Sequence, residues 1–286
     1  MKIELKKKRI TRSAGGDFIN FLLLVIAGMF TALPLLLVIV NAFKPLNEFF
    51  YFPIRFYVRN PTLDNFRDLF LIMSESWVPI SRYFFNTVLI SVLGTAGHVL
   101  VASAAAFALA KHCFPGRDQF FYLVILALMF VPQVTAIPNY LTMSALGWVD
   151  TYAAIIFPAW AMPLGLFLMK QFMEQIDSSL LEAARMDGAG EFLVFWHIVM
   201  PNVKPAWLTL AILCFQQLWN EWGGRFIYSE HLKPLPYALF SISAGGVARQ
   251  GVGAAVMLIM MSVPVIFFVF SQGRIVQTMG TAGIDK

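Results

Sequence analysis

The chain has 286 residues, of which 59% are hydrophobic and 13% are charged, and its net charge is +5. Soluble domains average about 45–50% apolar and about 25% charged residues, so this composition excludes an ordinary soluble protein and indicates one embedded in lipid. The positive charge is concentrated in residues 1–17, directly before the first apolar stretch. This placement is typical of a cytoplasmic anchor facing anionic lipid, and no basic patch elsewhere indicates nucleic-acid binding.

Six apolar stretches predict an all-α membrane protein with six transmembrane helices, since each can cross a hydrocarbon core about 30 Å thick. In chain order they are residues 18–43, 83–110, 120–143, 151–169, 205–228 and 252–272. Together they define one transmembrane domain, residues 18–273. Prolines inside the stretches predict kinks, and the Pro-containing segment 44–81 is expected to be irregular.

The placement of Lys and Arg predicts the orientation of these spans. Residues 111–117 and 170–204 carry Lys and Arg and are expected in the cytoplasm, whereas residues 139–150 carry none and are expected outside. An even number of spans then places both termini, including the tail 274–286, in the cytoplasm.

The longest polar interruption on the predicted cytoplasmic side is residues 174–205. Ser179 followed by Glu182 has the spacing of a capping box and predicts a helix start. Gly188 and Gly190 predict a sharp turn, after which a second amphipathic helix is expected to stop at Pro201. Apolar side chains on such a helix–elbow–helix need a partner groove if they project into water.

This segment resembles the EAA loop of binding-protein-dependent ABC importer permeases. The residues that carry the resemblance are Glu182, Ala183, Ala184, Asp187, Gly188, Ala189, Ile198 and Pro201. The longer run, EAARMDGA followed by F-W-x-I-x-x-P, is similar to the carbohydrate-uptake branch, which includes the maltose transporter permease. The resemblance extends over the basic N-terminus, the six spans, the position of the loop and the small-residue tail.

The resemblance implies the type I ABC importer permease fold, in which this loop forms a coupling helix that docks into a cytoplasmic ATPase. Glu182 would make a charged contact there, Ala183 and Ala184 would allow close approach, and Gly188 would set the turn. The alternative for Glu182 is a simple helix N-terminal cap.

The implied partners are a second homologous permease subunit, an ATPase dimer and an extracytoplasmic sugar-binding protein in a bacterial inner membrane. ATP and Mg²⁺ would bind to the ATPase, because this chain has no GxxxxGK[ST] loop and no metal-ligand spacing. We therefore expect a transporter subunit that is not itself an enzyme. A membrane-embedded enzyme would need a catalytic constellation, and none is evident.

Four polar residues in or at the end of the fifth stretch are candidates for the translocation path: Gln216, Gln217, Asn220 and Glu221. Polar groups at that depth are expected to face a bundle interior or water. The neighbouring Trp219 and Trp222 suit either sugar rings or an interfacial belt. In the related maltose system the sugar contacts lie largely on the partner permease, which implies that this subunit contacts substrate little.

The alternative function is a stand-alone secondary transporter or channel. Such a protein is expected to have an internal repeat and buried coupling carboxylates, and neither is evident. His98 lies within a span, where it is either a functional group or a neutral side chain bonded to a neighbouring helix. The resemblance suggests an oligosaccharide or glycoside as the transported solute.

Overall fold

The computed structural model describes residues 14–51, 53, 55–74, 77–243, 246 and 249–282, and each regular element among them is a helix. Most of the basic segment, residues 1–13, lies outside this part, as do the last four residues of the predicted tail. The contacts divide the chain into two units. The first comprises residues 1–69 and 246–258, and the second comprises residues 70–245 and 259–286.

The first unit contains α1 (Ala14–Ala42), the short 3-10 helix η1 (Leu46–Phe50) and the start of α2 (Asp64–Ser74). α1 covers the predicted first span, and the helix continues through Pro34, where a kink was predicted, without interruption. After it, the side-chain amide of Asn65 donates to the carbonyl oxygens of Ala42 at 2.9 Å and Lys44 at 2.8 Å. The prediction of a wholly irregular segment is therefore wrong, because polar side chains satisfy the backbone and two helices form there.

The central helix of the second unit is α3 (Ile80–Lys111), which confirms the second span. It packs against α6 (Ala153–Trp160), α7 (Pro163–Glu174) and α11 (Lys204–Trp219). A Cβ atom on Gly97 would lie 2.1 Å from the Trp160 indole, whose Nε1 donates to the Leu93 carbonyl at 3.1 Å. Small residues thus permit the close approach on which membrane helices depend.

Three predicted spans break or end earlier than expected. The third divides into α4 (Arg117–Leu128) and α5 (Pro132–Ala145), which meet at 115°. Pro132 has no N–H to continue the helix, and Val131 before it is extended. The fourth breaks before Pro163 for the same reason. The fifth, α11, ends at Trp219 rather than near residue 228.

Among the described residues, four helical segments are long and apolar enough to cross a membrane, with α6 and α7 together counted as one: Gly15–Ala42, Ile80–Lys111, Ala153–Glu174 and Gln250–Phe270. Two bent helix pairs raise the number to six. The second pair joins residues 191–202 to α11 at 80°. The sixth predicted span lies in α13 (Gln250–Ala282), which continues through most of the predicted tail 274–286. The six-span prediction therefore agrees with the structure only when each bent pair is one span.

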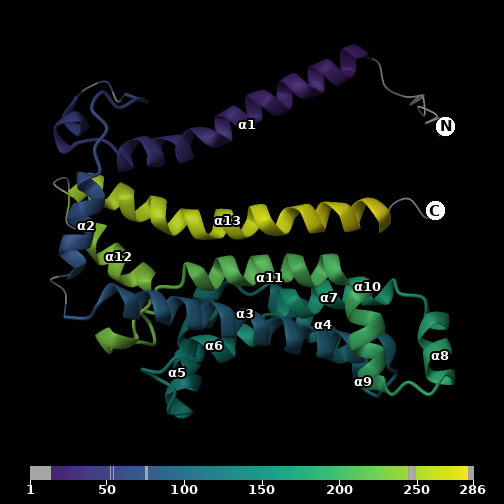
Figure 1. Cartoon of the computed structure of the whole chain (residues 1–286). Coiled ribbons are helices and arrows are strands. Elements are labelled where there is room, and N and C mark those ends of the chain that lie inside the picture. Colours follow the sequence, from purple (N-terminus) through teal and green to yellow (C-terminus); the bar gives the residue numbers. More distant parts are fainter. Residues whose placement is uncertain are drawn as a thin grey trace. The chain divides into compact units, whose positions relative to one another are not determined.

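Short helices lie at both ends of the second unit. α8 (Ser178–Met186) and α9 (Glu191–Val194) lie at one end of α3 and α11, whereas α5 and α12 (Leu235–Ser243) lie at the other (Figure 1). The ammonium group of Lys111 donates to the carbonyl of Ile176, so the loops predicted to share the cytoplasmic side are neighbours. The remaining short elements are the π-helical segment η2 (Phe195–Val199), α10 (Met200–Asn202) and the 3-10 helix η3 (Glu230–Leu232).

Candidate functional site

The first helix of the elbow begins one residue before the predicted cap. Asp177 is the N-cap of α8, and its Oδ1 accepts a hydrogen bond from the Ser179 backbone N–H at 2.9 Å. The same bond holds the pKa of the Asp177 carboxyl below its ordinary value. Ser179 and Glu182 both lie inside the helix, so the capping-box prediction is wrong. Aspartate caps a helix about as well as serine does, so the sequence offered two acceptors and the helix begins after the earlier one.

The turn after α8 confirms the predicted glycine elbow. Gly188 has φ +84°, a left-handed conformation that glycine adopts without steric cost. Its N–H donates to the Arg185 carbonyl at 3.0 Å, and the Ala189 N–H donates to the Ala184 carbonyl at 3.0 Å. These two bonds form a Schellman motif, which satisfies the last carbonyls of α8 and reverses the chain.

An ion pair that the sequence analysis missed spans this turn. Arg185 Nε lies 2.8 Å from Glu191 Oε1, and Arg185 Nη2 lies 3.2 Å from Glu191 Oε2. His112, just after α3, places its Nε2 3.4 Å from the same carboxylate. The signal in the sequence is a pair of opposite charges on either side of the two glycines. The pair connects α8 to α9 and both to the end of α3.

The second helix of the elbow was predicted to stop at Pro201, but it continues through this residue to Asn202. α9 passes into the π-helical segment η2 and then into α10, which contains Pro201 and ends at Asn202. The Met200 N–H bonds to the Phe195 carbonyl five residues back. This wider turn immediately precedes the proline, whose ring would clash with an ordinary helical turn.

Much of the apolar surface of the elbow is buried against the chain itself, so these side chains do not need the partner groove that was expected for them. The buried elbow side chains pack with Phe107 of α3 and Met169 and Met173 of α7; they are Leu181, Val194, Phe195, Val199 and Met200. Met186 and Phe192 remain 88% and 78% exposed.

We define the elbow surface as Glu182, Ala183, Met186 and Asp187, which are exposed and share one side of α8 by their helical spacing. Within the described residues, the Glu182 carboxylate makes no hydrogen bond or ion pair. Ala184, Ala189 and Ile198 are instead partly buried against the core.

The four candidate path residues do not gather at one place. Gln217 and Glu221 line a cavity of about 200 Å³ with Thr135 and Asn139 of α5. Gln216 lines a different cavity beside α13, next to Pro264 and other apolar residues. Successive residues on a helix point about 100° apart, so neighbouring glutamines face different elements.

Asn220, the fourth candidate, and Glu221 make hydrogen bonds at the end of α11. The Asn220 side chain donates to the Gln216 carbonyl at 2.7 Å, and Glu221 Oε1 accepts from the Gly223 N–H at 3.1 Å. Trp219 is buried, and its Nε1 donates to the Met260 carbonyl at 3.1 Å. It therefore offers no free face to a sugar ring and forms no interfacial belt. Trp222 is exposed.

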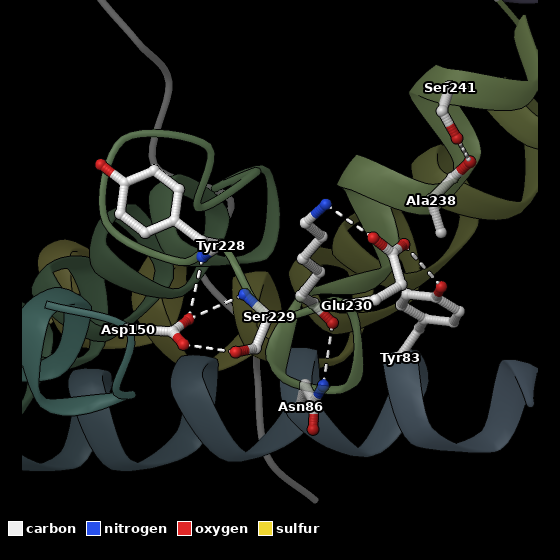
Figure 2. Close-up of polar contacts among 9 residues, drawn as sticks. Tyr83, Asn86, Asp150, Tyr228, Ser229, Glu230, Ala238 and Ser241 are labelled. Atoms are coloured by element: carbon white, nitrogen blue, oxygen red, sulfur yellow. Dashed lines mark hydrogen bonds and ion pairs between the residues drawn. The ribbon is translucent and has the colours of Figure 1, made fainter. Parts of the chain in front are cut away.

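A carboxylate that the sequence analysis did not select fixes the loop after α11. Asp150 Oδ1 accepts from the backbone N–H groups of Tyr228 at 2.9 Å and Ser229 at 2.8 Å, and Oδ2 accepts from the Ser229 hydroxyl (Figure 2). These bonds, those from Ser229 above all, lower the pKa of the Asp150 carboxyl. Asp150 has φ +62°, which aspartate tolerates better than most residues.

The same loop is also attached to α3. The Tyr83 hydroxyl donates to Glu230 Oε1 at 2.8 Å (Figure 2). The Asn86 amide donates to the carbonyls of His231 at 2.9 Å and Lys233 at 2.8 Å. The Lys233 ammonium lies 2.6 Å from Glu230 Oε2. The two attachments hold the loop against α3 and against the turn before α6.

The chain is similar to known proteins. Residues 98–279 match the family described as "Binding-protein-dependent transport system inner membrane component". The chain belongs to this family. It is 31% identical over 259 residues to the arabinooligosaccharides transport system permease protein AraQ of Halalkalibacterium halodurans, covering 88% of this chain and 90% of that protein. It is 34% identical over 217 residues to Protein LplC of Bacillus subtilis strain 168, covering 74% and 70%.

A solved structure has the same fold as this permease. It is that of a bacterial ABC transporter involved in the import of the acidic polysaccharide alginate, with a TM-score of 0.76 at 22% identity, covering 92% of this chain and 98% of the matched chain. The predicted fold class is thereby confirmed. Both the elbow and the Gln217–Glu221 cavity lie in the part of the permease that the family model matches.

The buried side chain of His98 packs between α3 and the helices α6 and α7. His98 Nδ1 lies 3.3 Å from the Trp160 carbonyl, and its ring abuts Gly165 of α7. This contact agrees with the interpretation of His98 as a side chain bonded to a neighbouring helix. Within the described residues, no group of three His, Cys, Asp or Glu side chains is arranged to hold a metal ion.

Proposed function

We propose that this permease is the membrane-spanning subunit of an ATP-driven importer of oligosaccharides. The observation that carries the proposal is the similarity to the arabinooligosaccharides permease over 88% of the chain. The chain would form half of a translocation pathway together with a second, homologous permease subunit. An extracytoplasmic sugar-binding protein would deliver the solute, in keeping with the description of the family.

The elbow is the proposed contact with the ATPase dimer, which would bind ATP and Mg²⁺ in place of this chain. Glu182, Ala183 and Asp187 are exposed and can reach a partner. Ala184, Gly188 and Ala189 supply the Schellman turn that aims α8. Ile198 and Pro201 shape the second helix, which anchors the elbow to the core. Motion of the ATPase would thus pass through α9 and α10 into α11.

The translocation path is proposed to pass Gln216, Gln217, Asn220 and Glu221. The support for Gln217 and Glu221 is that both line a cavity with polar residues of α5. In this arrangement the elbow and both termini, residues 1–17 and 274–286, lie on the cytoplasmic side, and the loop held by Asp150 lies on the opposite side.

Reconstitution tests the proposal. The chain is placed in proteoliposomes with its second permease, ATPase and binding protein, and uptake of labelled arabino-oligosaccharides is measured with and without ATP. We expect uptake only with ATP and only with the complete set of subunits. Uptake by the chain alone, driven by an ion gradient or by none, would instead support a stand-alone secondary transporter or channel.

A further inference from the structure

The cavity that Gln217 and Glu221 line is more polar than three other cavities in the described part of the chain. Its polar lining comes from α5, α11 and the loop after α11, and consists of Thr135, Asn139, Gln217, Glu221 and Arg225. The ring of Phe226 forms part of the same wall. The other three cavities are lined almost wholly by apolar side chains.

Two of the charged groups at this cavity retain unused bonding capacity. Only one oxygen of Glu221 accepts a hydrogen bond, from the Gly223 N–H. Within the described part of the chain, the Arg225 guanidinium makes no hydrogen bond or ion pair, with Glu221 or with any other group. Polar groups that line a cavity with free donors and acceptors are the usual means of orienting a ligand.

The formal charges of the lining sum to zero, since it includes one carboxylate, Glu221, and one guanidinium, Arg225. A site for phosphate or carboxylate solutes generally presents an excess of positive charge. Here two amides, a hydroxyl, a carboxylate and a guanidinium accompany one aromatic side chain, which is a donor and acceptor set suited to hydroxyl groups. The volume of about 200 Å³ is below the roughly 300–1,000 Å³ of pockets that enclose drug-sized ligands, so it suits one ring unit.

Asp150 lies outside the cavity lining but fixes the wall that carries Arg225 and Phe226. Its N–H donates to the Phe226 carbonyl at 2.7 Å, while its carboxylate binds the next residues of the loop, Tyr228 and Ser229 (Figure 2). The Phe226 ring also stacks on Tyr140 of α5, with centroids 6.4 Å apart. The wall is therefore held before any ligand arrives.

We propose that this cavity binds one uncharged, hydroxyl-rich ring of the transported solute, and that Asp150 positions its wall. The inference rests on the proposed function, which it deepens by naming the class of solute and the residues that select it. Gln217, Glu221 and Arg225 make the polar contacts, and Asp150 acts through the loop as a positioning residue.

Substrate protection in the reconstituted transporter tests this inference. Uptake is first measured for a neutral mixture, arabino-oligosaccharides, and an anionic one, alginate oligosaccharides. A Gln217→Cys variant in a Cys113→Ser background is then labelled with a methanethiosulfonate reagent, with and without the transported mixture. We expect the neutral mixture to be transported and to slow labelling about fivefold, the effect of occupancy at roughly four times the dissociation constant.

The chain offers a matched control one residue away. Gln216 is on the proposed path but lines the apolar cavity beside α13, so a ring bound beside Gln217 should slow the labelling of Gln216→Cys much less than that of Gln217→Cys. Asp150→Asn should raise the half-protecting sugar concentration about fivefold, the value of roughly one lost hydrogen bond, while the labelling rate without sugar stays unchanged.

Three results would overturn the inference. The first is transport of only the anionic mixture. The second is equal slowing of labelling at positions 216 and 217. The third is a labelling rate at position 217 that a transported neutral mixture does not change. Absence of ATP-dependent uptake for both mixtures would overturn the proposed function as well, and so separates the two failures.

Discussion

Arg185 donates to both carboxylate oxygens of Glu191, from Nε at 2.8 Å and from Nη2 at 3.2 Å, across the turn at Gly188. The two residues belong to different helices of the elbow, so their bond sets the angle between α8 and α9. Through His112 the same carboxylate also contacts the end of α3. The elbow is thus attached to the helix that packs against α6, α7 and α11.

The first prediction concerns this ion pair. Arg185→Glu or Glu191→Arg alone should lower ATP-driven uptake by about two- to fivefold, because both side chains are partly exposed and such pairs contribute only about 0.2–1 kcal/mol. The double exchange Arg185→Glu/Glu191→Arg should recover part of the uptake. A double variant no better than the worse single one would show that the pair does not set the elbow angle.

The second prediction concerns the glycine of the turn. Gly188→Val should abolish uptake while leaving ATP hydrolysis by the assembled transporter, because a β-branched residue resists positive φ and the left-handed conformation costs about 1–2 kcal/mol or more. No atom lies within 4 Å of a Cβ at Gly188, so backbone strain alone causes the effect.

Gly190 is the matched control for this change. It has φ −70° and open space around it, so Gly190→Ala should leave uptake within about twofold of the native value. Equal loss of uptake in both variants would refute the role of the left-handed turn.

The third prediction separates the observed cap from the predicted one. Asp177→Ala should destabilise α8 by about 0.5–2 kcal/mol, because the Ser179 N–H loses its acceptor. Ser179→Ala keeps that N–H and should have a smaller effect. Hydrogen exchange of the α8 amides in the two variants measures the difference, and greater exchange in Ser179→Ala would mean that serine is the true cap.

The fourth prediction is a pH dependence from Asp150. Its pKa is lowered in the folded state, first by the bonds from Ser229, so its stabilising contribution is complete above the ordinary aspartate value near 3.9. That contribution is lost as the pH falls through the lower, folded-state pKa. Thermal unfolding of the solubilised native chain and Asp150→Asn between pH 3 and 7 should converge at the acid end. A gap that widens toward low pH would reverse the sign and contradict the assignment.

Two kinds of feature were predicted best from the sequence: long apolar helices and the turn made by a glycine. Residues 83–110 lie in one continuous helix, as their apolar length predicted, and Gly188 turns the chain because only glycine adopts its φ freely. The apolar pattern did not predict the helix breaks before Pro132 and Pro163. A proline in an apolar stretch is not a sufficient signal for a break, because Pro34 leaves α1 uninterrupted. Whether a proline breaks a helix depends on its neighbours in space.

The polar contacts were harder to predict for the same reason. Asp150 and Ser229 are far apart in the sequence and carry no local motif, and the pairing of Gln217 with α5 requires the bend between α4 and α5. For the capping of α8, two acceptors lay within three residues, and the choice between Asp177 and Ser179 depended on where the chain enters the helix.

The claim that the elbow contacts the ATPase on the cytoplasmic side is tested most directly at Met186, whose exposed side chain lies on the elbow surface. Met186→Cys in a Cys113→Ser background is labelled with a membrane-impermeant maleimide in oriented vesicles that contain the complete transporter. We predict labelling only from the ATPase side, and slower labelling when the ATPase is bound than after it is stripped away. Labelling from the binding-protein side, or labelling that the ATPase does not slow, would contradict the account.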